Sequence, residues 1–213
     1  MARTFFVLSL LCTTLFINAQ RFEISVHADP QLTWLTSDET NISGSGSTMK
    51  LNTGLEFDVF FMPKYAFSFG ICLNNQGGKF LYRDSIAFTQ TTIPAGSIVK
   101  HNLQYVSAPL GLKLKSEELG YTTFYVHGGL APLFNLKANM SSEQPVIEKE
   151  NIRPDINLFS LNFFGEAGIE YRLAGNTAIK VGFRYSAGLT DVTVNDYANN
   201  NLASAGLHLG VLF

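Results

Sequence analysis

The stretch FEISVHADPQLTW, residues 22–34, decides the fold of this chain. Apolar side chains hold the even positions from Phe22 to Trp34, and mostly polar or charged side chains hold the odd ones. A period of two residues indicates a β-strand, because successive side chains of a strand point to opposite faces. The alternation lasts longer than a typical globular strand. It predicts a long strand over residues 21–35.

The same alternation recurs seven more times along the chain. Further strands are expected over residues 51–61, 67–74, 103–114, 124–137, 159–172, 179–189 and 203–213. The strand over 103–114 is irregular, because the apolar parity changes between Ser107 and Pro109. A β-bulge produces such a one-residue slip and tolerates a proline, so a bulge is predicted there. Residues 75–78, NQGG, indicate a glycine turn at a strand end.

The connections between these strands alternate in length. Short turns are expected at 62–65, 116–120 and 174–176, and long polar loops at 36–49, 83–98, 139–155 and 191–200. Short turns on one side and long loops on the other are typical of outer-membrane barrels. The predicted fold class is therefore all-β, an eight-stranded antiparallel up-and-down transmembrane β-barrel whose lumen is filled by side chains.

The first residues form a separate segment. Arg3 precedes an apolar run from Phe5 to Ile17, which is too short to span a bilayer as a helix. A small residue, Ala19, precedes Gln20 and fits a cleavage site. Residues 1–19 are thus a predicted secretory signal peptide, and residues 20–213 a single barrel domain. An exported chain without a long apolar helix is expected to be either a soluble protein or a transmembrane barrel.

The apolar face of the strands is predicted to meet lipid. It carries bulky rings such as Phe57 and Phe183, whereas the opposite face is rich in Gly, Ser and Ala and suits a narrow interior. The apolar parity holds no Asp, Glu, Lys, Arg or His, and a Lys or Arg in the lipid midplane costs roughly 2–4 kcal/mol. Aromatic residues gather toward the strand ends, as membrane interfaces favour. Those on the long-loop side are Trp34, Tyr105, Phe134 and Phe159.

Two motifs carry a family resemblance. YVSAPLGLK, residues 105–113, resembles the Tyr-x-x-x-Pro-Leu-x-x-Lys strand of the PorT-like outer-membrane β-barrel family, which is common in Bacteroidetes, and YVHGGLAP, residues 125–132, resembles its next strand. The strand ending at Phe213 resembles the C-terminal signal read by the barrel-assembly machinery. The resemblance implies an architecture and a place in the outer membrane of a Gram-negative bacterium, not a reaction.

Charged residues on the inward parity are expected to fill the lumen as pairs, because an unpaired buried charge costs several kcal/mol. They are Glu23, Asp29, Glu56, Asp58, Lys113, Lys137, Glu166, Glu170, Arg172, Lys180 and Arg184. An ion pathway is the alternative. His27, His127 and His208 share this parity and are expected to be hydrogen-bonded interior residues rather than metal ligands. His101 lies near a loop without an evident partner.

The sequence gives little support for catalysis. A catalytic barrel needs a nucleophile and a base near the long-loop rim or on the lipid face. The rim offers acids but no convincing histidine partner. These acids are Asp38, Glu39, Asp84, Asp155, Asp191 and Asp196. We therefore expect no enzyme, no catalytic, cofactor-binding or metal-binding residues, and no cofactor. A net charge of −2 over 213 residues also argues against nucleic-acid binding.

The expected function is that of an integral outer-membrane barrel, structural or binding through its long extracellular loops. Residues 139–155, with Pro145 and Pro154, form the best candidate contact surface. The expected partners are outer-membrane lipid, the barrel-assembly machinery and an unidentified extracellular or membrane protein. One alternative is a small channel or a transport or secretion accessory. Another is a soluble periplasmic ligand-binding barrel.

Overall fold

The structure, a computed structural model, describes residues 21–88, 92–142, 146–194 and 200–213. The predicted signal peptide, residues 1–19, lies outside the described residues. No helix in these ranges is long and apolar enough to cross a membrane. In chain order the elements are β1 Phe22–Ser37, β2 Ile42–Gly46, β3 Thr48–Met62, β4 Tyr65–Tyr82, β5 Ile86–Ala87, β6 Thr92–Ile93, β7 Ser97–Ser107, β8 Leu110–Lys115, β9 Thr122–Ser142, β10 Ile147–Asn151, the 3-10 helix η1 Arg153–Asp155, β11 Phe159–Ala174, β12 Thr177–Gly188 and β13 Asn200–Leu212.

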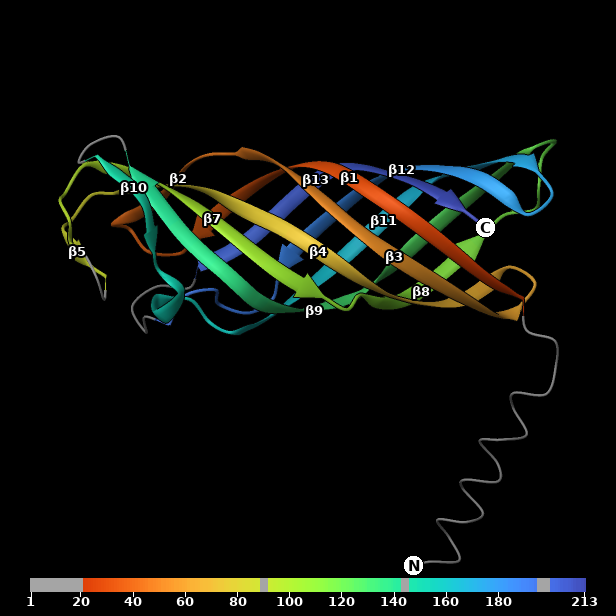
Figure 1. Cartoon of the computed structure of the whole chain (residues 1–213), viewed down its shortest axis with the longest axis horizontal. Coiled ribbons are helices and arrows are strands. Elements are labelled where there is room, and N and C mark those ends of the chain that lie inside the picture. The colour runs from red at the N-terminus through yellow and green to blue at the C-terminus, as the bar shows by residue number, and fades with distance from the viewer. Residues whose placement is uncertain (1–20, 89–91, 143–145, 195–199) are drawn as a thin grey trace, which may run out of the picture.

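Among the described residues, eight strand paths form a closed antiparallel ring (Figure 1). Its order is β1, β3, β4, then β7 continued by β8, and then β9, β11, β12 and β13. The strands β7 and β8 form one path, since each pairs with β4 and with β9. The ring closes where β1 pairs with β13, from Ser25 opposite Leu212 to Ser37 opposite Asn200. The predicted eight-stranded up-and-down barrel is confirmed.

The bulky apolar parity faces outward, as predicted. Phe183 is 57% exposed and Leu209 is 39% exposed on the outer surface, whereas Glu166 on the opposite parity is only 5% exposed. Rings on neighbouring strands also contact one another on the outside, and Phe57 packs between Phe22 and Phe69. The outer surface of the barrel is therefore an apolar belt of the kind that meets hydrocarbon.

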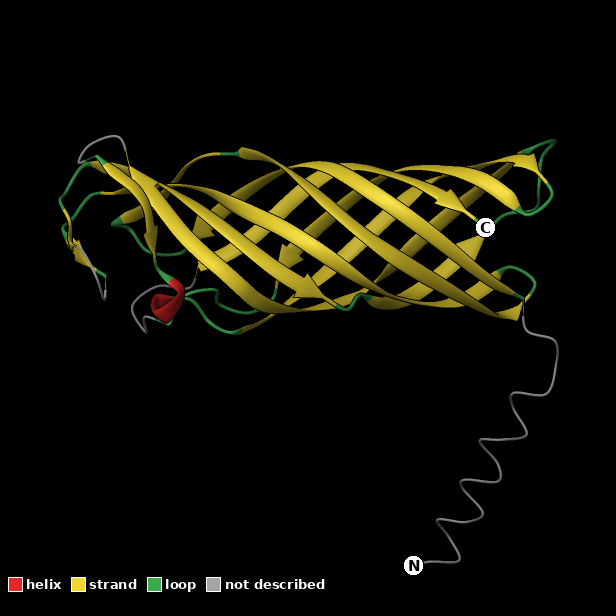
Figure 2. Cartoon of the chain, in the orientation of Figure 1, coloured by secondary structure: helices red, strands yellow, loops and turns green. Residues whose placement is uncertain are grey.

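Several strands continue past this belt on the long-loop side, at the left of Figure 2. The unbroken outward apolar series ends at Leu73 on β4 and at Val106 on β7, yet β4 runs on to Tyr82 and β7 begins at Ser97. We call this region the long-loop extension: the parts of β4, β7 and β9 beyond Leu73, Val106 and Leu136, together with β2, β5, β6 and β10. The predicted loops 36–49 and 139–155 are thus largely strand, and the predicted loop 83–98 contains the short strands β5 and β6 and the start of β7.

The predicted bulge between Ser107 and Pro109 is wrong. Cys72 lies opposite Ser107 and Phe69 lies opposite Leu110, so the pairing register with β4 continues across the proline. The apolar parity changes because the medium outside changes. In the belt lipid lies outside and apolar residues face out, whereas in the long-loop extension apolar residues such as Leu103 face in. The actual register shift lies in the pairing of β7 with β9, next to Leu136.

The segment NQGG at residues 75–78 is not a turn, because it lies inside β4. Its glycines allow β4 to pass close to its neighbours. A Cβ atom on Gly77 would lie 2.1 Å from the carbonyl oxygen of His101, and one on Gly78 would lie 2.7 Å from the backbone nitrogen of Leu35. Since backbone atoms cannot move aside cheaply, only glycine fits these two positions.

Candidate functional site

Ion pairs link side chains across the short-turn half of the lumen. The Lys113 Nζ lies 2.5 Å from the Asp58 Oδ2 and 3.1 Å from the Glu170 Oε1. The Lys115 Nζ lies 2.6 Å from the other Glu170 oxygen and 2.5 Å from the Glu23 Oε2. Both lysines come from β8, and the three acids come from β1, β3 and β11. This network therefore ties together strands from opposite sides of the barrel.

A second group of charges continues the network toward the middle of the barrel. The Lys180 Nζ lies 2.7 Å from the Glu56 Oε1 and 3.3 Å from the Glu166 Oε1. The Tyr125 hydroxyl donates a hydrogen bond to the Glu166 Oε1 at 2.7 Å. The Arg184 Nη1 lies 3.5 Å from the other Glu166 oxygen. Buried charges that are paired in this way fill the cross-section of the barrel rather than line an open channel.

Most predicted inward charges lie in the lumen, with two corrections. Lys137 is exposed, because the register shift beside Leu136 turns it outward. Arg172 is also exposed; it pairs with Glu118 near the short turns. Lys115 is a buried member of the network that the parity analysis missed. Its position, two residues beyond Lys113 on the same face of β8, was the available signal.

The three predicted interior histidines are buried. Asp29 lies between two of them: its Oδ2 is 3.0 Å from the His27 Nδ1, and its Oδ1 is 2.9 Å from the His208 Nδ1. The rings of His27 and His208 lie 4.7 Å apart. His127 packs edge-on against Phe164, with the ring centroids 4.8 Å apart. The pairing of His27 with His208 across neighbouring strands follows from the closure of β1 on β13.

The donor atoms of His27, Asp29 and His208 all lie within 4.8 Å of one another, a spacing that a metal ion requires. Each Asp29 oxygen, however, already has an imidazole nitrogen at hydrogen-bond distance. These donors therefore pair with one another as close charges. The expectation that the lumen holds no metal stays a prediction.

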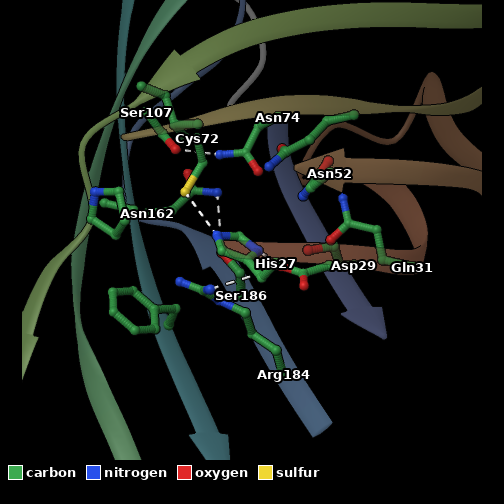
Figure 3. A pocket seen from close by; sticks show the side chains of 16 residues that line it. His27, Asp29, Gln31, Asn52, Cys72, Asn74, Ser107, Asn162, Arg184 and Ser186 are labelled. Carbon is green, nitrogen blue, oxygen red and sulfur yellow. Dashed lines mark hydrogen bonds and ion pairs between the residues drawn. The ribbon is translucent and has the colours of Figure 1, made fainter. Parts of the chain in front are cut away.

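A cavity of about 30 Å³ in the lumen is lined in part by His27 (Figure 3). Its polar lining includes His27, Asp29, Cys72 and Arg184. The Cys72 Sγ lies 3.4 Å from the His27 Nε2. A space of this size admits molecules no larger than water. The cavity does not form a binding site for an organic ligand.

The lumen of the long-loop extension is closed by an apolar core. Strand residues such as Phe80 and Met140 point inward there, and residues from the connecting segments, including Ile93 and Ile156, cover them. Tyr105, which was predicted at the membrane interface, is fully buried in this core. Burying each of these large side chains stabilises the fold by about 1.5–3 kcal/mol. The long-loop end of the barrel is therefore closed by a folded core.

His101 belongs to this core, and its lack of a partner was a wrong prediction. Its Nε2 lies 3.1 Å from the Tyr82 hydroxyl, and its ring packs edge-on against Phe80. Burial lowers the pKa of His101 to about 4 and raises the pKa of Tyr82. At neutral pH the core therefore holds an uncharged imidazole. The available sequence signal was its shared parity with Leu103 and Tyr105.

A closed antiparallel ring with an apolar exterior and a filled, charged interior defines an integral outer-membrane β-barrel protein. The family model described as outer membrane protein beta-barrel domain matches residues 18–194. The chain belongs to this family, and its place is the outer membrane of a Gram-negative bacterium. A search of curated proteins finds no match.

Comparison with solved structures finds similar chains at low sequence identity. Neisserial surface protein A (NspA) is 13% identical, with a TM-score of 0.52 over 92% of this chain and 98% of that chain. OprG from Pseudomonas aeruginosa is 10% identical, with a TM-score of 0.49 over 91% and 97%. Ail of Yersinia pestis is 14% identical, with a TM-score of 0.44 over 90% and 98%. At these identities the likeness to NspA shows the fold alone.

Proposed function

We propose that this protein is a non-conducting, non-catalytic outer-membrane barrel that binds a partner through its long-loop end. The observation that carries the proposal is the double closure of the lumen. Paired charges fill the membrane-spanning part, with Lys180 and Lys113 fully buried among carboxylates, and an apolar core closes the extension above. A solute would have to break both layers to pass.

The channel alternative is tested by planar-bilayer recording of the purified, refolded protein. We expect no discrete current steps at 100 mV, because Lys113 and Lys180 are fully buried among carboxylates and the cavity beside His27 and Arg184 is only about 30 Å³. A general porin inserted into the same lipid serves as the positive control. Discrete steps that recur in independent preparations and scale with protein concentration would overturn the proposal.

The distribution of histidines supports a non-catalytic role. His27, His127 and His208 lie in the lumen and His101 in the apolar core, and all four are buried. Each acid predicted at the rim therefore lacks a neighbouring exposed histidine within the described ranges. A rim-based nucleophile would consequently have no imidazole to act as its base. Asp196, one of the predicted rim acids, lies outside the described residues.

The proposed contact surface is the top of the long-loop extension. Its best candidate segment, residues 139–155, consists of the end of β9, then β10 and the helix η1 that contains Pro154. Pro145 lies outside the described residues. Strands and a 3-10 helix give this segment a defined shape, which suits recognition of a protein or glycan. Capture of partners in mild detergent, comparing the wild type with a variant whose residues 147–151 are replaced by Gly and Ser, tests this assignment.

The side chains of β13 support the proposal that the barrel-assembly machinery recognises this chain through that strand. The alternate apolar side chains of β13 and of the residue that follows it face outward: Leu207, Leu209, Val211 and Phe213. We infer that this apolar edge is what the machinery reads when it inserts the chain. Within the family, the motifs at 105–113 and 125–132 favour the PorT-like branch, which stays a prediction.

A further inference from the structure

Three lysines gather at the long-loop extension, and we call them the lysine patch: Lys79 of β4 and Lys100 of β7 on its outer face, and Lys50 of the neighbouring β3, whose ammonium group reaches Asn102 on that face. Lys79 and Lys100 lie directly opposite each other on paired strands, so their side chains share one face. The Lys50 Nζ donates a hydrogen bond to the Asn102 Oδ1 at 2.7 Å, two residues from Lys100 on the same face. The patch therefore brings three ammonium groups from three strands together.

The lysine patch has no neutralising carboxylate. Within residues 21–88, 92–142, 146–194 and 200–213, no acidic group lies at ion-pair distance from any of the three lysines, whereas Lys64, Lys113, Lys115 and Lys180 are all paired. Partial burial, and after it the charge of Lys100, lower the pKa of Lys50. Like charges directly opposite each other on paired strands repel. An anion bound from outside would remove this repulsion.

The distance of the lysine patch from the apolar belt indicates which kind of anion it could bind. The unbroken outward apolar series of β4 ends at Leu73, and the next outward positions on this face include the polar residues Asn75 and Gln104. Apolar side chains return on this face beyond the lysines, at Leu81 and Ile98. Lys79 follows Leu73 by six positions, or roughly 15 Å along the barrel axis for a strand tilted by about 40°. Lys50 lies lower on β3, opposite the buried Gln31, and its neighbours Met49 and Leu51 are exposed apolar side chains on the other face of β3. The lysines thus extend upward from the edge of the belt.

Ordinary phospholipid headgroups fill only about 5–8 Å on each side of the hydrocarbon. An anion that meets all three lysines must extend further from the belt, as phosphates on a saccharide headgroup do. We propose that the lysine patch binds the phosphate groups of the outer-leaflet glycolipid, lipopolysaccharide. Each phosphate offers several acceptor oxygens to the ammonium donors, and the Asn102 amide fixes the direction of the lowest lysine.

The test uses the full chain folded in neutral phosphatidylcholine nanodiscs and titrated with lipopolysaccharide whose headgroup is phosphorylated. The patch variant carries Lys50→Gln, Lys79→Gln and Lys100→Gln. A matched control removes the same number of charges elsewhere, with Lys64→Gln, Lys149→Gln and Arg172→Gln. We expect the Kd of the patch variant to rise at least tenfold, and that of the control to change less than twofold. Equal affinities of patch variant and wild type would overturn the proposal.

Further arms distinguish the possible sources of phosphate. Lipopolysaccharide treated with phosphatase should bind the wild type at least tenfold more weakly. Phosphatidylglycerol in the nanodisc and 10 mM inorganic phosphate should each leave lipopolysaccharide binding within twofold. Strong competition by phosphatidylglycerol would instead assign the patch to any anionic lipid, and competition by inorganic phosphate would assign it to a free anion; either result contradicts the glycolipid proposal. The single exposed variant Lys79→Gln, with at least threefold weaker binding expected, keeps the test valid if the triple variant misfolds.

Discussion

At the scale of single residues, the interior of this barrel is held together by ion pairs in which each buried charge needs its partner. Glu56 and Glu166 both depend on Lys180, and Glu166 is also bound by the Tyr125 hydroxyl. A buried ion pair adds little net stability compared with an apolar pair of the same shape. Removing one partner is different, because the remaining charge stays buried without compensation. The lumen is therefore sensitive to single substitutions that a water-filled pore would tolerate.

The substitution Lys180→Met tests this dependence. It keeps an unbranched side chain of similar length but leaves Glu56 and Glu166 without their shared cation, so we expect a loss of about 3–5 kcal/mol in the free energy of unfolding. Urea unfolding in phosphatidylcholine vesicles, followed by the fluorescence of Trp34, the one tryptophan of the chain, measures it. The control Lys64→Met, in an exposed pair with Glu117, should cost less than about 1 kcal/mol. Equal losses for the two variants would contradict the buried-network account.

At the scale of elements, the feature that sequence analysis misread was the strand that passes from one medium into another. Leu110, Leu112 and Leu114 face lipid, whereas Leu103 and Tyr105 on the same path face the apolar core of the long-loop extension. An apolar side chain faces outward where lipid surrounds the barrel and inward where water does. Alternation alone indicates a strand, but it does not indicate which face of the strand meets water and which meets lipid. The change of apolar parity was therefore predicted to be a bulge.

The long-loop extension should lose stability in mild acid through His101. Its pKa is about 4 in the folded protein and 6.5 in its unperturbed state, so between these values the unfolded chain binds more protons. The stabilisation is complete above pH 6.5 and should fall by about 1 kcal/mol per pH unit from pH 6 to pH 4. Amide hydrogen exchange of Phe80–Tyr82 and Val99–Leu103, corrected for intrinsic rates, measures this loss.

The variant His101→Phe is the matched control for that measurement. It keeps an aromatic ring against Phe80 but cannot take up a proton. The difference in protection between pH 7 and pH 5 should therefore shrink in this variant. If wild type and variant lose protection equally over this range, another group is responsible and the assignment to His101 fails.

At the scale of the whole molecule, the sequence predicted the architecture well because lipid imposes a strong rule on every strand. The absence of charges from the apolar parity predicted the outer face, and residues as distant as Phe57, Phe183 and Leu209 obey it. The contents of the long-loop extension could not be predicted in the same way. Its core joins Ile93, Ile156 and Val192 from connecting segments, and no local period reveals which distant side chains such residues cover.

The substitution Phe183→Lys tests the lipid-facing assignment. Phe183 lies in the apolar belt, where a lysine costs roughly 2–4 kcal/mol. The control Val194→Lys introduces the same charge at a position that is 53% exposed on the long-loop side, where we expect less than about 0.5 kcal/mol. Urea midpoints in phosphatidylcholine vesicles compare the two. A Phe183→Lys protein as stable as wild type would show that water, not hydrocarbon, touches this face.

The pairing of β1 with β13 has a consequence for biogenesis. A nascent chain that stops before residue 200 has both β1 and β12 but no strand to join them. Two rows of unpaired amides and carbonyls would then face the bilayer, where no solvent can satisfy them. Closure of the ring in the membrane therefore has to wait until β13 is available to pair with both β1 and β12.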